Sequence, residues 1–475
     1  MSRRIRAIAL IALAAILAWQ VVTRSLAAHF AASAPETALM LRPTEPKALL
    51  TLAEKRIAAD YAARASQQPG ATAPKPAAQA KTGPGEASDR LRLWAELAFK
   101  TIDKRPEDAR PADKPSGQSA PPPAPGLDRQ TAEQVRAWAE LALGNDPLNA
   151  RALRILGQVA DGARDEERVA KFMRAAARGS IRESAAVYWL MRKSYEKGDY
   201  AATIHWADVL LRTRSQIGQY VMPTLVRLSE YRNASDELKK VLANNPPWRS
   251  AFLAAIASGG SDPRTPLEFL LALREGADPP SANDLRTYLN AMIGRKQYEL
   301  AYYAWLQFLP PEHLTSAGLL FNGSFEAAPS GMPFDWVFGS GSGVTVDVAP
   351  RPDKDGQHAL LIDFGHGRVE FGGVRQLVML APGTYEFKGK YKGEVVGKRG
   401  LVWRIACAPS NAPLGESPMT VGVTPKWRDI EFSFTVPDTD CRAQVLQLVL
   451  DARMPSELLV SGSIWHDELR ISPVR

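Results

Sequence analysis

The spacing of hydrophobic positions divides the chain into three regions. An uncharged, largely apolar run extends from Ala7 to Val22 and is interrupted only by Gln20. In residues 46–65 and 128–309, apolar side chains recur every three to four positions, which is typical of amphipathic helices. Beyond Pro310 and Pro311 the period changes to two, and glycine and β-branched residues become more frequent, as in short strands. The pattern predicts a chain that is α-helical first and β-stranded last.

The N-terminal run indicates a membrane segment. Arginines at positions 3, 4 and 6 precede the run and Arg24 follows it, which favours an N-terminus left in the cytoplasm. Its length lies between a signal-peptide core and a full span. Trp19 stands where an interfacial aromatic anchor would stand, whereas Ser25-Leu26-Ala27 resembles a cleavage site. We expect residues 1–27 to be a signal anchor, with the bulk of the chain in the bacterial periplasm. Cleavage to a periplasmic or secreted protein is the alternative.

Residues 36–127 combine short helices with linkers. A helix is expected from Pro46 to Ala65 and another from Arg90 to Ile102. Between and after them, residues 66–86 and 105–126 are rich in Pro and Ala with almost no large apolar side chain. Such segments bury too little surface to offset the entropy of ordering, so we expect them to be disordered.

Internal repetition appears in the helical part. Trp94-Ala95-Glu96-Leu97-Ala98 recurs as Trp138-Ala139-Glu140-Leu141-Ala142, and a proline follows each copy. Pro147, Gly157 and the turn Gly198-Asp199-Tyr200 fit the same pattern. In these residues the segment 128–316 resembles the tetratricopeptide repeat (TPR). The resemblance implies a solenoid of stacked helix pairs whose concave surface binds protein partners.

Residues 319–475 are expected to form an antiparallel β-sandwich or jelly roll, because short strands alternate with Gly/Pro turns. The expected strands are Val344–Val348, Ala359–Phe364, Val369–Phe371, Arg375–Leu380, Tyr385–Tyr391, Leu401–Cys407, Asp429–Phe434, Ala443–Leu450 and Ser463–Ile471.

Three motifs carry a family resemblance in this region. They are Leu320-Phe321-Asn322-Gly323-Ser324-Phe325-Glu326 at the start, Ala381-Pro382-Gly383-Thr384-Tyr385 in the middle, and Ile464-Trp465-His466-Asp467-Glu468 at the end. The region looks like the galactose-binding-like jelly roll of carbohydrate-binding modules found beside glycanases. The resemblance implies a structural calcium held by Glu326, Asp467 and a backbone carbonyl near Gly356. Alternatively, both carboxylates cap turns.

Strand alternation sorts the candidate ligand-binding residues. Trp403 is in phase with apolar neighbours and belongs to the core. The opposite faces carry Lys388, Lys390, Arg404, Gln447 and Asp451. If these faces form one concave sheet, they suit a charged or hydrogen-bond-rich glycan; otherwise they are an ordinary solvated face.

A further candidate is Trp336, which precedes the loop 339–343. It either contacts a ligand or closes the end of the core.

Composition changes this picture in two ways. The only cysteines, Cys407 and Cys441, lie in the β-region of an exported chain, which suggests a disulfide. The net charge of +8 is spread among acidic residues rather than gathered in a block. A solvated surface, with no nucleic-acid partner, is the simplest interpretation; a polyanionic glycan or an anionic membrane surface stays open.

Signs of catalysis are few. The six histidines show no zinc spacing, the Gly-Ser-Gly-Ser-Gly run does not fit a nucleophile elbow, and no phosphate or dinucleotide fingerprint occurs. The hypothesis is therefore a non-enzymatic, membrane-anchored periplasmic scaffold. It would bind proteins through its repeats and a polysaccharide through its sandwich, in surface-polysaccharide assembly or export. The alternatives are an envelope protein-interaction scaffold without a glycan ligand, and a glycoside hydrolase or lyase.

Overall fold

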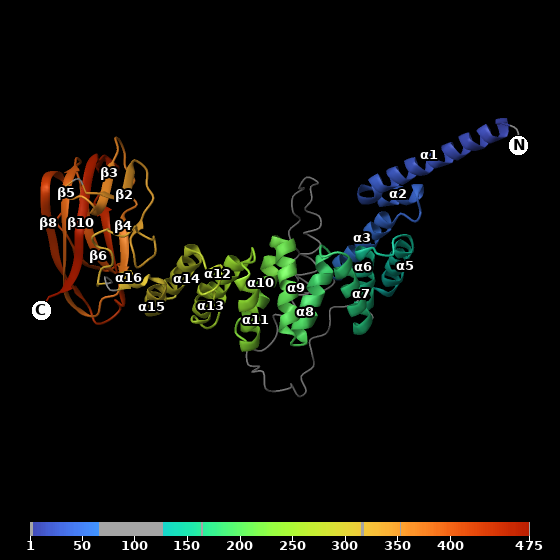
Figure 1. Ribbon diagram of the computed structural model, residues 1–475, viewed down its shortest axis with the longest axis horizontal. Coiled ribbons are helices and arrows are strands. Elements are labelled where there is room, and N and C mark those ends of the chain that lie inside the picture. Colours follow the sequence, from blue (N-terminus) through green and yellow to red (C-terminus); the bar gives the residue numbers. More distant parts are fainter. Residues whose placement is uncertain (1–2, 66–126, 163–164, 315–317, 352, 475) are drawn as a thin grey trace. The chain divides into compact units, whose positions relative to one another are not determined.

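The computed structural model describes residues 3–65, 127–162, 165–314, 318–351 and 353–474 (Figure 1). The chain forms two compact units, Met1–Arg249 and Ser250–Arg475. Several expectations lie outside the described residues. These are the disorder of 66–86 and 105–126, the helix at 90–102 and the first copy of the Trp-Ala-Glu-Leu-Ala repeat.

The first unit is helical throughout its described part. Its elements are α1 (Arg3–Ser33), α2 (Pro35–Leu41), α3 (Pro46–Ala65), α5 (Arg129–Asn145), α6 (Ala150–Gly162), α7 (Glu166–Gly179), α8 (Ser184–Glu196), α9 (Tyr200–Thr213), η1 (Ser215–Ile217), α10 (Gly218–Leu228) and α11 (Arg232–Ala243).

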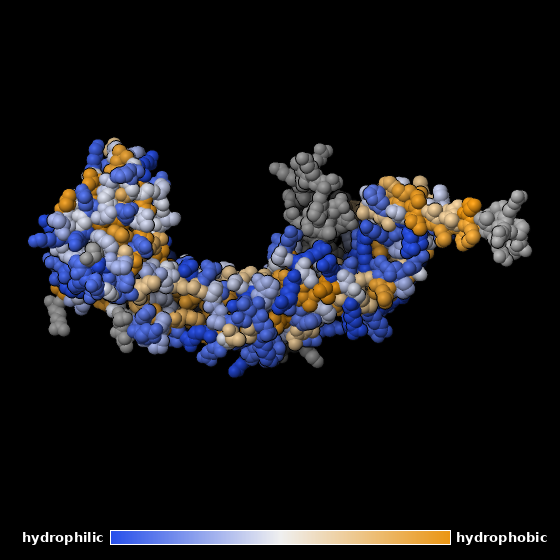
Figure 2. Space-filling model, turned by 45° about the horizontal axis from the view of Figure 1, so that its top comes forward, coloured by the Kyte–Doolittle hydropathy of each residue, from blue (hydrophilic) through white to orange (hydrophobic). Residues whose placement is uncertain are grey.

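Helix α1 changes character along its length. Between Leu10 and Ser33 it is long and apolar enough to cross a membrane, and its large side chains from Leu10 to Val22 are exposed; Figure 2 shows apolar surface along this helix. Further along, Ala27 and Ala31 are fully buried, where α1 packs on α2 and α3. Ala31 shares a small core with Ala38 and Ala48. The same helix is thus apolar and unpartnered first, and part of a packed bundle afterwards.

The helices α3, α5 and α6 share one core although residues 66–126 separate α3 from α5 in sequence. Glu54 of α3 accepts hydrogen bonds from Arg151 and Arg154 of α6. Gly157 lets α6 approach α7, since a Cβ there would lie 2.9 Å from the Met173 methyl carbon. The tetratricopeptide assignment of these helices stays a prediction.

The second unit combines helices with strands. Its helices are α12 (Arg249–Gly259, which begins at the boundary), α13 (Thr265–Arg274), α14 (Ala282–Gly294), α15 (Tyr298–Phe308), α16 (Pro311–Leu314) and η2 (Pro455–Leu458). Its strands are β1 (Val337–Phe338), β2 (Val344–Pro350), β3 (His358–Phe364), β4 (Val374–Val378), β5 (Gly383–Val395), β6 (Leu401–Ala408), β7 (Pro413–Glu416), β8 (Gly422–Val436), β9 (Ala443–Leu450) and β10 (Gly462–Pro473).

The strands form two antiparallel five-stranded sheets. Sheet A has the order β1-β4-β9-β6-β7 and sheet B the order β2-β3-β10-β5-β8. Inward side chains of both sheets form a single core that includes Trp403, which is fully buried as predicted. The predicted antiparallel sandwich is confirmed. The strand predicted at Val369–Phe371 is wrong, because this glycine-flanked segment is not part of either ladder.

Helix α15 packs directly on the sandwich. Trp305 is 3% exposed, and its ring centroid lies 5.1 Å from that of Phe321 and 5.7 Å from that of Phe334. Tyr302 meets Phe334 edge-on at 5.2 Å. On α14, Arg286 donates hydrogen bonds to the carbonyl oxygens of Ser330 and Gly331, each at 3.2 Å. The sandwich and the helices α14 and α15 therefore share a packed interface within the second unit.

Candidate functional site

The candidate ligand residues lie on two different surfaces. Lys388 and Lys390 point outward from β5 in sheet B, whereas Arg404 on β6, Gln447 on β9 and Asp451 just after β9 belong to sheet A. The hypothesis that they form one concave face is wrong. Alternation correctly separated outward from inward positions, but the two sets face away from each other on opposite sides of the sandwich.

The lysines of sheet B are neutralised by their neighbours. Lys388 pairs with Glu386 at 2.9 Å and with Glu431 at 3.5 Å, and Lys390 pairs with Glu468 at 2.7 Å. Such exposed pairs contribute little to stability. They also leave no free cation at either lysine.

Sheet A carries a row of polar side chains that runs straight across its strands. Arg375 of β4 pairs in register with Gln447 of β9, which pairs with Arg404 of β6, which pairs with Glu416 of β7. We call these four residues the polar row. Directly opposed residues on antiparallel strands lie about 5 Å apart, so neighbouring members are close enough to contact one ligand. Arg375 and Glu416 were not among the sequence candidates.

Two members of the polar row are held in place by ion pairs. Arg404 donates to Glu416 at 3.0 Å and to Asp451 at 2.5 Å, and Asp451 also pairs with Arg399 at 3.2 Å. Partial burial acts to lower the pKa of the Arg404 guanidinium, but its hydrogen bonds to these carboxylates outweigh burial and raise the pKa. By contrast, the side chains of Arg375 and Gln447 make no hydrogen bond or ion pair with the residues that the structure describes. Their donors and acceptors are free for a ligand.

Aliphatic residues flank the polar row on both sides. Leu377, Val445 and Ala406 form one flank, and Val449 and Val402 form the other. Val402 and Ala406 are only 4% and 6% exposed although they face outward. The accessible apolar surface beside the polar row therefore comes from Leu377, Val445 and Val449, which are partly exposed.

Trp336 lies in the core. It is fully buried and stacks on Phe325 with ring centroids 5.2 Å apart. Its indole N–H donates to the Asn322 carbonyl at 2.8 Å. The structure therefore places Trp336 where it closes the end of the core, away from any exposed face.

The two carboxylates proposed for calcium have other partners. Asp467 is 2% exposed and pairs with Arg351 at 2.6 Å; burial raises the pKa of Asp467, and the hydrogen bond from Arg351 offsets part of that. Glu326 accepts a hydrogen bond from the His358 backbone N–H at 3.3 Å. Calcium requires six to eight oxygen ligands, and the described residues contain no group of three or more acidic, His or Cys side chains placed to hold a metal. Arg351 already pairs with Asp467, and a calcium ion at Glu326 and Asp467 stays a prediction.

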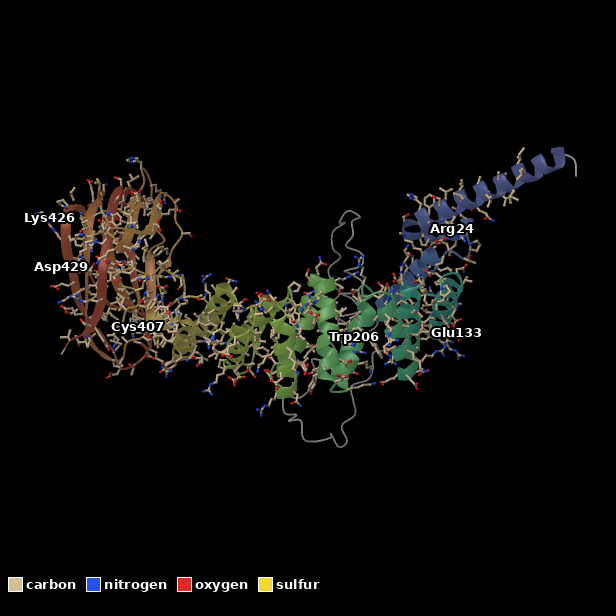
Figure 3. All side chains as sticks on the ribbon, viewed as in Figure 1. Arg24, Glu133, Trp206, Cys407, Lys426 and Asp429 are labelled. Atoms are coloured by element: carbon tan, nitrogen blue, oxygen red, sulfur yellow. A yellow bond between two sulfur atoms is a disulfide. The ribbon has the colours of Figure 1, made fainter. Side chains whose placement is uncertain are left out.

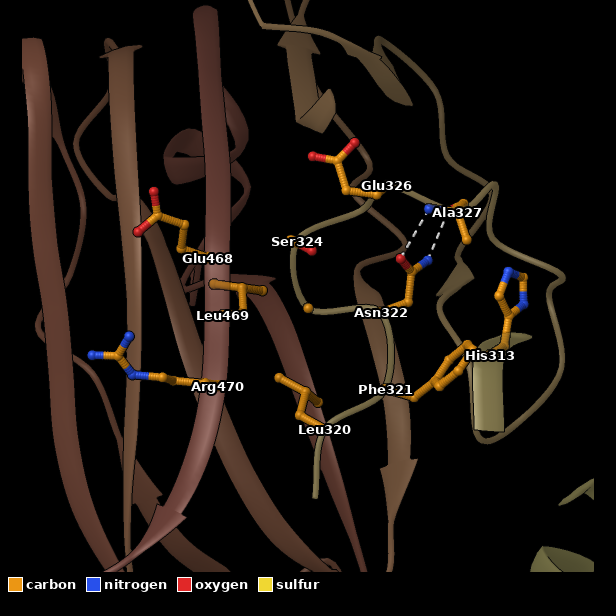
Figure 4. Close-up of a pocket in the computed structure, with 11 residues that line it drawn as sticks. His313, Leu320, Phe321, Asn322, Ser324, Glu326, Ala327, Glu468, Leu469 and Arg470 are labelled. Carbon is orange, nitrogen blue, oxygen red and sulfur yellow. Dashed lines mark hydrogen bonds between the residues drawn. The ribbon is translucent and has the colours of Figure 1, made fainter. Parts of the chain in front are cut away.

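The loop that carries Glu326 also borders a cavity of about 560 Å³ (Figure 4). Asn322, Ser324 and Glu326 lie on one side, and Leu469 of β10 faces them across it. The Leu469 N–H donates to the Gly323 carbonyl at 2.9 Å. A Cβ on Gly323 would lie 2.0 Å from the Leu469 oxygen, so only glycine fits there. The first and last motifs of the sandwich are therefore joined by main-chain contact.

Cys407 and Cys441 form the predicted disulfide, with Cα atoms 5.0 Å apart (Figure 3). The bond joins β6 to the segment that precedes β9, beside the paired residues Ala408 and Ala443. It therefore braces the two strands that carry Arg404 and Gln447.

Solved structures that are similar to this chain match about a third of its length. No family model and no curated protein matches the chain. Among solved structures, the sandwich is similar to a family 4 carbohydrate-binding module (17% identity, 33% of this chain, 99% of that chain, TM-score 0.25). It is also similar to a xylan-binding family 22 module from Paenibacillus barcinonensis (18%, 32%, 92%, 0.23) and to a family 61 module in complex with β-1,4-galactotriose (18%, 33%, 98%, 0.24). At these identities the ligand has to be argued from the surface of this chain.

Proposed function

We propose that the protein is a non-catalytic, membrane-anchored glycan-binding protein, and that the polar row on sheet A is its binding site. The observation that carries the proposal is the register that aligns Arg375, Gln447, Arg404 and Glu416 across four strands. Sugar hydroxyls need paired donors and acceptors, and sugar C–H faces need apolar contact. The row supplies the former and its aliphatic flanks the latter. A polysaccharide lying across the strands would contact both.

The binding site can be tested by affinity electrophoresis of the detergent-solubilised full chain through gels that contain purified bacterial exopolysaccharides, neutral and acidic. At least one polysaccharide should retard the wild-type chain. Gln447→Ala should weaken that binding about tenfold, because it removes hydrogen bonds worth about 1.4 kcal/mol. Lys388→Ala on sheet B is the matched control and should change nothing. Absence of retardation by every polysaccharide, or equal effects of both substitutions, would contradict the proposal.

The anchor is proposed to be retained rather than cleaved. Ala27 belongs to the small-residue stretch that resembles a cleavage site, yet Ala27 and Ala31 are fully buried against the following helices. Small residues one helical turn apart let helices approach closely, which explains their presence without a protease. A disulfide in the second unit accords with an oxidising compartment such as the periplasm. N-terminal sequencing of the mature protein tests this directly, since a start at Ala28 would show cleavage.

We propose that the first unit is the scaffold that binds protein partners in polysaccharide assembly or export. Stacked helix pairs would offer an extended surface to protein partners. Co-purification of protein partners with the full chain that persists after Gln447→Ala would support a protein-binding role separate from the glycan. Its loss in the same variant would instead indicate that partners are held through the polysaccharide.

A further inference from the structure

The end of the sandwich where β5 ends and β8 and β10 begin has an unusually apolar surface. Six exposed side chains gather there, and we call them the distal patch. They are Val396 (51% exposed), Met419 (38%), Val421 (41%), Val423 (64%), Met454 (61%) and Leu459 (56%). Apolar surface is visible at the upper end of the sandwich in Figure 2. Exposed apolar groups that cluster, rather than scatter singly, mark interaction sites.

Main-chain contacts show that the three loops of the distal patch adjoin one another. Val396 forms a β-bridge with Ser461, next to Leu459. A Cβ on Gly400 would lie 2.9 Å from Val421, and the Gly400 N–H donates to the Met419 sulfur at 3.3 Å. The loop holding Met454 is tied to the same place by Arg399, which pairs with Glu457 at 3.7 Å.

The chemistry of the distal patch favours lipid over the other candidate occupants. Its six side chains are aliphatic or thioether, with none of the aromatic rings on which sugars stack. The β-bridges at Val396 and Leu401 already use main-chain groups of these loops, which disfavours addition of a partner strand. Aliphatic loop tips of this kind suit shallow burial at the boundary between lipid headgroups and acyl chains.

Exposed charges of both signs surround the distal patch. Arg368, Lys398 and Arg453 are exposed and make no ion pair among the described residues. The exposed acids at this end of the sandwich are Asp363, Glu370 and Glu394, so the exposed charges balance and the apolar side chains carry the assignment.

We propose that the distal patch docks on a lipid bilayer. The inference rests on the proposed function in one respect: α1 holds the chain at a membrane, which raises the local concentration of the sandwich beside lipid. Docking would present the polar row of sheet A close to the membrane, where a polysaccharide in assembly is found. The contact is peripheral and reversible, since six aliphatic side chains are far short of a membrane span.

Fluorescence quenching tests the proposal on the full chain, reconstituted in nanodiscs of phosphatidylcholine and phosphatidylglycerol. The described residues hold no free cysteine, so an environment-sensitive dye attached at Val423→Cys reports one position. Doxyl-labelled lipids should quench this dye at least twofold. Glu431→Cys is the matched control: it lies on the same strand about 25 Å away, and its dye should not be quenched.

A second variant separates docking from anchoring. Adding Leu459→Asp and Val421→Asp should abolish quenching at Val423 while the chain still co-elutes with nanodiscs through α1. Quenching that survives both charges, or an unquenched dye at Val423 in the parent, overturns the docking proposal. Failure of the chain to co-elute with nanodiscs would instead refute the membrane anchor. Polysaccharide binding is measured separately, by affinity electrophoresis.

Discussion

The buried histidine of β10 makes the stability of the second unit dependent on pH. His466 is fully buried, and its Nε2 has no hydrogen-bond partner in the described structure. Its Nδ1 accepts a hydrogen bond from the Trp403 indole N–H at 3.4 Å. Burial lowers the pKa of His466 from 6.5 to about 3. The imidazole is therefore neutral in the folded protein throughout the physiological range.

The sign of the effect follows from which state binds the proton. Below pH 6.5 the unfolded chain protonates at His466, whereas the folded protein stays neutral until about pH 3. The free energy of unfolding therefore falls as the pH is lowered through this window. Each pH unit costs about 1.4 kcal/mol, which gives about 2 kcal/mol at pH 5 and about 5 kcal/mol at pH 3. Above pH 6.5 the imidazole is neutral in both the folded and the unfolded chain, so His466 causes no loss of stability there.

Urea unfolding of residues 246–475, at pH 7.5 and at pH 5, measures this dependence. His466→Leu is the comparison, because it cannot titrate and approximates the size of the ring. The wild-type fragment should lose about 2 kcal/mol more than the variant between the two pH values, because the contributions of other titrating groups largely cancel in the difference. Equal losses, within about 0.5 kcal/mol, would show that His466 does not carry the effect.

Three further predictions concern contacts that hold the second unit together. Trp305→Ala should lower the free energy of unfolding of residues 246–475 by about 3–5 kcal/mol in urea, since it removes a large buried side chain; a loss below 1 kcal/mol would contradict the packed helix–sandwich interface. Replacing Cys407 and Cys441 by alanine should cost about 4 kcal/mol, from the unfolded-state entropy of a loop with a sequence separation of 34; unchanged urea midpoints would refute it. Arg351→Met should cost about 3–5 kcal/mol by leaving Asp467 buried without a cation, and adding Asp467→Leu should recover much of that loss.

Local patterns predicted the elements better than their arrangement. The change of period near Pro310 correctly divided helices from strands, and alternation correctly assigned Trp403 to the core. Neither could show that Lys388 and Arg404 belong to different sheets, because strand order depends on pairings between segments far apart in sequence. The pairing of Arg375 with Gln447 was hidden for the same reason.

The site was only partly within reach of sequence reasoning. Gln447 and Arg404 could be found because each alternates with apolar neighbours on its own strand, and Asp451 because it continues the alternation of β9 by one residue. Glu416 was missed because β7 is a short strand of four residues without a clear alternating pattern. The partner of Asp467 was also out of reach, since Arg351 meets it only after the segment following β2 brings it to β10.

The aromatic contact between α15 and the sandwich has a mechanical consequence. A polymer held across sheet A and drawn away by its own growth or export would exert a sideways pull on the sandwich. Since Trp305 and Tyr302 are wedged against Phe321 and Phe334, the sandwich cannot swivel on α15 to relieve that pull. The pull would be transmitted as torque to α15, so that tension on the polymer would act on the helices of the second unit.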